Sequence, residues 1–239
     1  MHYVLFSFYS YLCNIICQAK RIDDSETSMG QRFWLPLLFF LTLCIPSKGQ
    51  DGFAVYELSD SIFTLMQGKS YPKDCTVKRE ELRYLTVLHV DAKGKTHKGE
   101  LVCNKMIAND LIDIFKKLYD AKYPIERMQL IDNFDADDER SMAANNTSCF
   151  CYRVVNGSSK LSNHSLGMAI DINPLYNPCV RNKKVQPKSG APYTNRARTF
   201  SYKIERGDLL WKLFTERGFR WGGAWRSLKD WQHFEKVKK

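Results

Sequence analysis

The chain carries the stretch Ser162-Asn163-His164-Ser165-Leu166-Gly167-Met168-Ala169-Ile170-Asp171 and, nearer its C-terminus, Asp230-Trp231-Gln232-His233. Imidazole and carboxylate side chains are common ligands of catalytic zinc ions in proteins. Such a site has three protein ligands and a fourth position open to water or substrate, whereas a structural zinc site is closed by four. We therefore expect Zn2+ as the cofactor, bound by His164, Asp171 and His233, and a hydrolytic reaction.

The spacing of the first two ligands predicts a loop followed by a strand. His164 and Asp171 are too far apart in the sequence for one helical turn, and Gly167 between them allows the chain to turn. In the strand predicted for 168–172, alternation places Ala169 and Asp171 on the same face. A carboxylate that points inward from such a strand needs a cation, which supports its role as a ligand.

The last ligand lies in the strand predicted for 231–237, where alternation sends Trp231, His233 and Glu235 to one face. Asp230 is best interpreted as the general base. A carboxylate beside a zinc-activated water can accept its proton and later deliver that proton to the leaving amine. The alternative is that Asp230 only orients His233, as carboxylates near metal-bound histidines often do.

Two further residues are candidates for contact with substrate. Hydrolysis through a tetrahedral intermediate needs a positive group near the developing oxyanion or the substrate carboxylate, and Arg153 is the candidate. An ordinary surface ion pair is the alternative role for this arginine. Ser162 is expected to hold the loop of His164 or to touch substrate. A nucleophilic role for Ser162 is not supported, because no base is visibly paired with it.

The combined pattern Ser162-x-His164-x-x-Gly167-x-Ala169-x-Asp171 and Asp230-x-x-His233 resembles the signature of a family of zinc peptidases. These are the D-alanyl-D-alanine carboxypeptidases and L-alanyl-D-glutamate endopeptidases, which include vancomycin-resistance D,D-peptidases and phage endolysin peptidases. Asn173-Pro174 after the ligand Asp and the run from Gly218 to Trp225 fit the same family. The similarity extends roughly from residue 75 to 237.

The resemblance implies a single compact α+β domain with a central antiparallel sheet flanked by helices, one zinc ion, and peptidoglycan stem peptides as substrate. It implies His164, Asp171 and His233 as zinc ligands, Asp230 as catalytic base and Arg153 as the oxyanion or substrate contact. Carboxypeptidases and dipeptidases of the family often have Glu at the position of Asp230, while the endolysin-like endopeptidases use Asp. We therefore favour cleavage between L-Ala and D-Glu over removal of a terminal D-Ala.

The N-terminal region is interpreted as a leader rather than as part of the folded domain. The apolar run 33–45 has the length of a signal-peptide core, is preceded by Arg32 and is followed by small residues near Gly49. We expect residues 29–49 to be the signal peptide, 1–28 an over-extended N-terminus or leader, 50–74 a helix and linker, and 75–239 the zinc peptidase domain. Two membrane-embedded segments, 3–17 and 33–45, are the alternative. Export to a bacterial periplasm, cell envelope or exterior follows from the signal peptide.

The cysteines and the net charge say less about function than the motif does. Residues after the leader include five cysteines, an odd number, so at least one thiol stays free. Cys149-Phe150-Cys151 lacks a second pair at matching spacing and is weak as a metal motif. The same part of the chain has 32 Lys or Arg against 23 Asp or Glu. Such an excess favours anionic surroundings such as wall polymers or lipid head groups, although a solubilising surface is equally consistent with it. No nucleic-acid motif is present, and a monomer is expected.

Hydrophobic periodicity predicts a mixture of elements without regular alternation, which indicates an α+β fold. Polar segment 132–146, with four acidic residues close together at 135–139, is interpreted as a solvated loop rather than a calcium site because it lacks calcium-loop spacing. Segment 173–202 is predicted to be a long irregular excursion bordering a binding site. The predicted strands cover 82–90, 99–102, 127–131, 150–155, 168–172, 219–221 and 231–237, and the predicted helices 57–66, 104–119 and 208–217.

Two other function classes are compatible with parts of the pattern. A binding module of the same fold, as in hedgehog signalling domains, would keep the metal site without turnover. The presence of Asp230 favours catalysis, because a purely structural zinc does not need a spare carboxylate. A thiol hydrolase that uses Cys149 or Cys151 has no supporting motif.

Overall fold

A long β-hairpin and the helix that follows it build the first half of the fold in the computed structural model, which describes residues 52–155 and 159–237. β2 (Leu82–Val90) and β3 (Thr96–Asn104) pair antiparallel, and β1 (Ala54–Glu57) pairs with β2 on its other side. Alternate residues of β2 and β3 are apolar and point to the same face, where they are buried. The strands predicted for 82–90 and 99–102 are therefore confirmed, and the second is longer than predicted.

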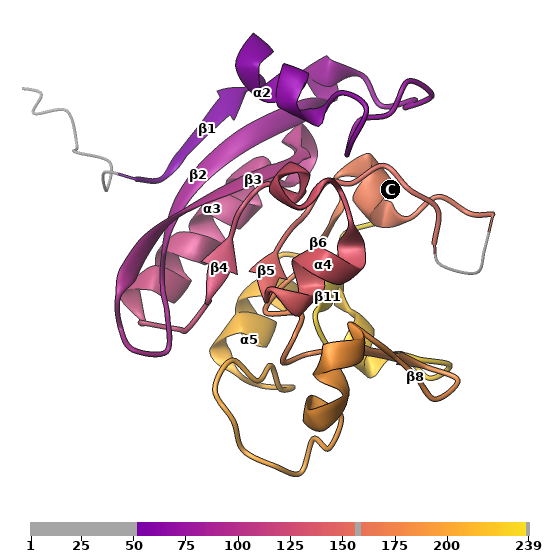
Figure 1. The fold of residues 1–239 in the computed structure, drawn as a ribbon. Coiled ribbons are helices and arrows are strands. Elements are labelled where there is room, and N and C mark those ends of the chain that lie inside the picture. The colour runs from indigo at the N-terminus through magenta and orange to yellow at the C-terminus, as the bar shows by residue number, and fades with distance from the viewer. Residues whose placement is uncertain (1–51, 156–158, 238–239) are drawn as a thin grey trace, which may run out of the picture. The chain divides into compact units, whose positions relative to one another are not determined.

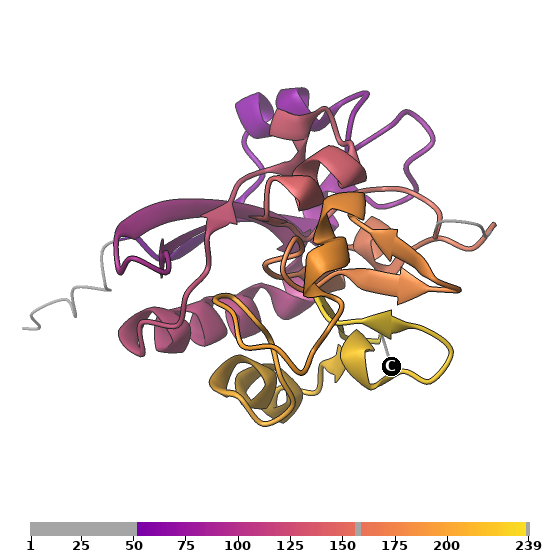
Figure 2. The same ribbon diagram turned by 60° about the horizontal axis from the view of Figure 1, so that its bottom comes forward.

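Helix α3 (Lys105–Asp120) covers this buried face of the sheet (Figures 1 and 2). It begins as predicted at Asn104, whose side-chain oxygen accepts the Met106 N–H at 3.0 Å. Its apolar residues recur every three or four positions and are buried: Ile107, Leu111, Ile114, Phe115 and Leu118. The other side of α3 packs against α5 (Leu209–Glu216), a predicted helix capped by Asp208.

The second half of the fold is made of short strands that bring distant segments together. β6 (Ala169–Asp171), β11 (His233–Glu235) and β9 (Arg220–Trp221) form one antiparallel sheet in the order β6-β11-β9. β10 (Lys229–Asp230), β7 (Cys179–Arg181) and β8 (Lys184–Gln186) form another, in the order β10-β7-β8. β4 (Arg127–Met128) and β5 (Asn146–Thr147) make a parallel pair.

The α+β class with antiparallel sheets is confirmed, and within the described residues the antiparallel strands are divided among three sheets of three strands each rather than gathered in a single one. Of the segment predicted as 50–74, the described residues 52–74 contribute more than a helix and a linker. β1 extends the first sheet, and Leu58 and Met66, the latter in α2 (Asp60–Met66), are buried in a core cluster with Leu82 and Phe150. The predicted segments 1–28 and 29–49 lie outside the described residues. Among residues 52–155 and 159–237, no helix is long and apolar enough to cross a membrane.

Four predictions along the chain are wrong, each because tertiary contacts decide the local structure. The predicted strand 150–155 is an irregular segment whose N–H groups bond to different neighbours, such as Val102, His164 and Ser70. The predicted strand 127–131 is confined to β4. A 3-10 helix, Ile131–Phe134, follows it.

The predicted solvated loop 132–146 contains helix α4 (Asp138–Ala143), which begins at the capping residue Asp137. The predicted irregular excursion 173–202 contains the β7–β8 hairpin and a 3-10 helix, Lys188–Tyr193. This excursion is fixed by the Arg196 guanidinium, which donates to the carbonyls of Tyr176 and Ile204 and to the Asn177 side chain.

Gly167 closes the 3-10 helix Asn163–Leu166 and joins the two halves of the fold. Its φ is 64°, its carbonyl accepts the Asn104 N–H at 2.9 Å, and a Cβ here would lie 2.6 Å from the Asn104 nitrogen. Gly94, in the β2–β3 turn, also has a positive φ, 77°, but a Cβ there would meet nothing within 4 Å.

We predict that Gly167→Ala lowers the free energy of unfolding by about 2–4 kcal/mol, since it adds a backbone clash to the strain of a left-handed conformation. Gly94→Ala carries the strain alone and should cost about 1 kcal/mol. Urea denaturation of both variants measures the difference. Equal losses would show that the close approach of Gly167 to β3 does not contribute.

Candidate metal centre

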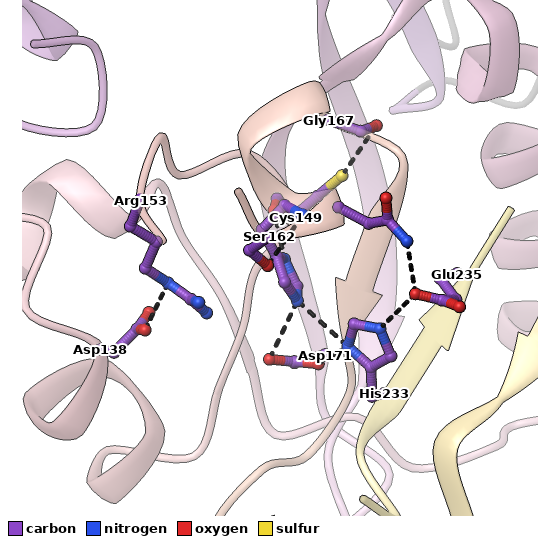
Figure 3. A network of polar contacts seen from close by, with 10 residues as sticks. Asp138, Cys149, Arg153, Ser162, Gly167, Asp171, His233 and Glu235 are labelled. Atoms are coloured by element: carbon purple, nitrogen blue, oxygen red, sulfur yellow. Dashed lines mark hydrogen bonds and ion pairs between the residues drawn. The ribbon is translucent and has the colours of Figure 1, made fainter. Parts of the chain in front are cut away.

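The register between β6 and β11 places two of the predicted ligands directly opposite each other. Asp171 pairs with His233 across the two strands, and Asp171 Oδ1 lies 2.9 Å from His233 Nδ1. The neighbouring pair, Ile170 and Phe234, points to the other face and is fully buried in the core. Figure 3 shows the Asp171 and His233 side chains pointing toward each other, with Glu235 beyond the imidazole. Alternation along both strands thus produces the arrangement predicted from the sequence.

The third predicted ligand reaches the same point from the 3-10 helix. The Ser162 hydroxyl accepts the His164 N–H at 3.2 Å and so begins this helix. His164 Nε2 then lies 3.3 Å from Asp171 Oδ2 and 3.2 Å from His233 Nδ1. Ser162 therefore holds the loop of the ligand, one of the two roles expected for it.

The donor atoms fit a zinc ion in number, type and spacing. Ligands about 2.1 Å from a tetrahedral zinc lie roughly 3.4 Å from one another, close to the distances within this cluster. The other nitrogen of each imidazole is also engaged, as is usual for metal-bound histidines. His164 Nδ1 lies 2.6 Å from the Cys149 carbonyl oxygen, and His233 Nε2 lies 3.4 Å from Glu235 Oε2. Among the described residues, His164, Asp171 and His233 are the group able to hold a metal ion.

Charge interactions within the cluster shift the pKa values of its residues. Burial acts to raise the pKa of Asp171, yet the two adjacent histidines hold it well below its usual range. Burial acts to lower the pKa of His233, but Asp171 and Glu235 raise it to about 10. Glu235 in turn is held by Asn163 and Arg220 as well as by His233. The negative charge gathered around the imidazoles is the environment that a divalent cation favours.

Asp230 lies beside the cluster with one oxygen unpaired. It pairs with Cys179 between β10 and β7, and its Oδ1 is buried without a hydrogen-bond partner. Burial, opposed by the charge of His233, raises the pKa of Asp230 to about 6. A Cβ on Gly222 would lie 2.9 Å from the Asp230 Cβ and 3.2 Å from that of His233, so the glycine allows both residues their positions. An unpaired carboxylate oxygen in this place is suited to receiving a proton.

Arg153 approaches from the other side and forms an ion pair with a partner that the sequence did not predict. Its Nε contacts the Asp138 carboxylate, at the first turn of α4, outside hydrogen-bond geometry (Figure 3). Both backbone groups of Arg153 bond to the Ser165 hydroxyl, which ties the arginine to the 3-10 helix of His164. Burial acts to lower the pKa of Arg153, but the charges of Asp138 and Asp171 raise it. Arg153 is therefore a half-buried cation that is paired with Asp138 and interacts electrostatically with Asp171 of the cluster.

Residues 156–236 match the model of the D-alanyl-D-alanine carboxypeptidase family. This match confirms the family resemblance predicted from the motif. The matched segment contains the three predicted ligands and Asp230, and it begins just after Arg153. No solved structure matches the chain significantly. The finding supports a peptidase of this family as the general class of activity.

Among the described residues, no cysteine belongs to the cluster of His164, Asp171 and His233. Burial raises the pKa of Cys149 well above its usual value and that of Cys151 to about 12, so neither thiol is poised as a nucleophile. The acidic run 135–139 does not converge on one point either. Asp135 pairs with Lys69 and Arg140, whereas Asp137 caps α4. These contacts agree with the prediction that the run is not a calcium site.

Sequence reasoning missed Asp138, the role of Glu235 and the position of Cys179. The role of Glu235 could have been predicted, because alternation already placed it on the face of His233 and a carboxylate commonly partners a metal-bound imidazole. Asp138 gave no signal, since it lies in a polar stretch without periodicity. Cys179 faces Asp230 only because β7 pairs with β10.

We predict that the purified protein binds one zinc ion and that His164→Ala weakens this binding more than about 100-fold, because one of three ligands is lost. His97→Ala is the matched control. His97 lies in β3 and contacts Asp91, with Nε2 2.9 Å from Oδ2. Competition with a coloured chelator measures both affinities. Equal zinc affinity in the two variants would contradict the assignment of His164.

Proposed function

We propose that this protein is a zinc-dependent peptidase that hydrolyses amide bonds in the stem peptides of peptidoglycan. One observation carries the proposal: the cluster of His164, Asp171 and His233 lies beside the unpaired, buried oxygen of Asp230. A structural zinc would be closed by a fourth protein ligand and would not need that carboxylate. The match to a carboxypeptidase family over the same residues supports the substrate class.

The chemistry divides between the metal and the side chains. When bound, zinc supplies Lewis acidity that polarises a carbonyl and acidifies water. Asp230 would accept the proton of the attacking water at Oδ1 and return it to the leaving amine. With a pKa of about 6, this carboxyl is ionised at neutral pH yet is basic enough to hold the proton briefly.

Arg153 would stabilise negative charge on the substrate, either the oxyanion that forms at the scissile carbonyl or a free carboxylate of the stem peptide. Its Nε faces Asp138, and its backbone is fixed by Ser165. An arginine held at both ends loses little side-chain entropy when substrate binds. Asp138 thus acts as a positioning residue for the substrate contact.

Two finer points of the proposal concern which bond is cleaved and in which compartment the protein acts. We favour the L-Ala–D-Glu bond over a terminal D-Ala–D-Ala bond, because an Asp rather than a Glu stands at position 230. We propose that the protein acts after export, in the compartment that contains peptidoglycan, on the basis of the signal-like run 33–45. N-terminal sequencing of secreted protein would test the export, and an unprocessed N-terminus would contradict it.

We predict that Asp230→Asn lowers kcat by about 100- to 10,000-fold, the range expected for the loss of a general base. Zinc binding should remain, because Asp230 is outside the ligand cluster. Asp113→Asn, an exposed change on α3, is the control and should leave kcat unaltered. Turnover and zinc content are measured on the same samples. A fully active Asp230→Asn protein would defeat the assignment of the base.

We also predict that the zinc-loaded protein separates a defined muropeptide after its first residue, L-Ala, and that a chelator abolishes the cleavage. Mass spectrometry of the products identifies the bond. Release of a terminal D-Ala would instead show carboxypeptidase action and would correct the favoured bond. Zinc-loaded protein that cleaves neither bond would support the alternative of a binding module.

A further inference from the structure

Two buried cysteines from different halves of the fold lie side by side behind the metal centre. Cys103 is in β3 and Cys149 follows β5, and their exposed fractions are 0% and 3%. The Phe150 N–H donates to the Val102 carbonyl at 2.9 Å, and each cysteine is one residue from this bond. Cys149 Sγ also lies 3.6 Å from the Gly167 carbonyl oxygen (Figure 3). The two residues therefore come from adjacent, hydrogen-bonded segments.

The core clusters show which way the two residues face. Cys103 and Cys149 belong to one buried core cluster, whereas Val102 and Phe150, the residues joined by the hydrogen bond, belong to the other. The two cysteine side chains therefore lie on the same side of the hydrogen-bonded segments.

The pKa of Cys149 agrees with this placement. Burial is the main cause of its raised pKa, and the neighbouring Cys103 thiol raises it further.

We propose that Cys103 and Cys149 form a disulfide bond when the chain folds in the presence of a low-molecular-weight disulfide such as oxidised glutathione. One cysteine thiolate attacks the oxidant and releases one glutathione thiolate, which gives a mixed disulfide. The second cysteine thiolate then attacks this mixed disulfide and releases the other glutathione. Two protein thiols are oxidised, and one glutathione disulfide is reduced to two thiols.

The bond would brace the metal centre. The Cys149 carbonyl holds Nδ1 of His164, and β3 holds the 3-10 helix of that ligand through Asn104 and Gly167. A covalent link from Cys149 to β3 would therefore fix both supports of His164 to each other. The remaining cysteines contact other groups: Cys75 the Val77 carbonyl, Cys151 Arg153 and Asp138, and Cys179 Asp230.

Peptide mapping of the wild-type full chain tests the proposal and does not depend on peptidase activity. The protein is refolded with reduced and oxidised glutathione, its free thiols are alkylated in denaturant, and a digest is analysed by mass spectrometry. We expect a peptide pair joined through Cys103 and Cys149, with alkyl groups on Cys75, Cys151 and Cys179. Alkylation of both Cys103 and Cys149, or a bond from either to another cysteine, would overturn the proposal.

Thermal unfolding provides a second readout. A bridge that closes a loop of about 45 residues should raise the wild-type Tm by about 5–15 °C on oxidation. A variant with both Cys103→Ser and Cys149→Ser should not respond to the oxidant. A wild-type Tm that is the same in oxidised and reduced protein would contradict the proposal. If the bond forms but no peptide is cleaved, this inference stands while the proposed peptidase activity fails.

Discussion

The rest of the site depends on one buried carboxylate held between two imidazoles. Asp171 contacts His233 at 2.9 Å and His164 at 3.3 Å, and all three side chains are at least nine-tenths buried. Removing an ionised carboxylate from water costs several kcal/mol unless nearby positive charge or a cation compensates. In this fold the carboxylate is buried where β6, β11 and the 3-10 helix Asn163–Leu166 converge. A metal ion at that point would supply the compensating positive charge.

The surrounding structure can be understood as support for this convergence. On the opposite face of β6 and β11, Ile170 and Phe234 anchor both strands in the core shared with α3 and α5. Gly167 and Gly222 permit approaches that a side chain would prevent, one against β3 and one against Asp230 and His233. The two carboxylates just outside the ligand set then differ in their surroundings. Glu235 is paired and has a pKa of about 2, whereas Asp230 has an unpaired oxygen and a pKa of about 6. This difference is the basis of the proposal that the first residue orients His233 and the second transfers the proton.

The ligands and their strands could be predicted because the relevant signals are local. Residue type, a turn glycine and two-residue alternation placed Asp171 and His233 on inward faces, and α3 followed from its apolar spacing and its capping Asn104. Asp138 and the β7–β8 hairpin could not be predicted in this way. Both lie in polar segments, and their conformation depends on distant partners such as Arg153 and Arg196. The irregular path of 150–153 has the same cause, since its backbone groups bond to three separate parts of the chain. Contact between Cys103 and Cys149 likewise exists only once β3 and the segment after β5 are packed together.

X-ray absorption at the zinc edge of the reconstituted protein tests the central claim most directly, because it reports the atoms bound to the metal. The account predicts nitrogen and oxygen ligands at about 2.0–2.1 Å, including two imidazoles, and no sulfur. A sulfur ligand at about 2.3 Å would contradict it, since a thiolate such as that of Cys149, Cys151 or Cys179 would then have to take part in the metal centre.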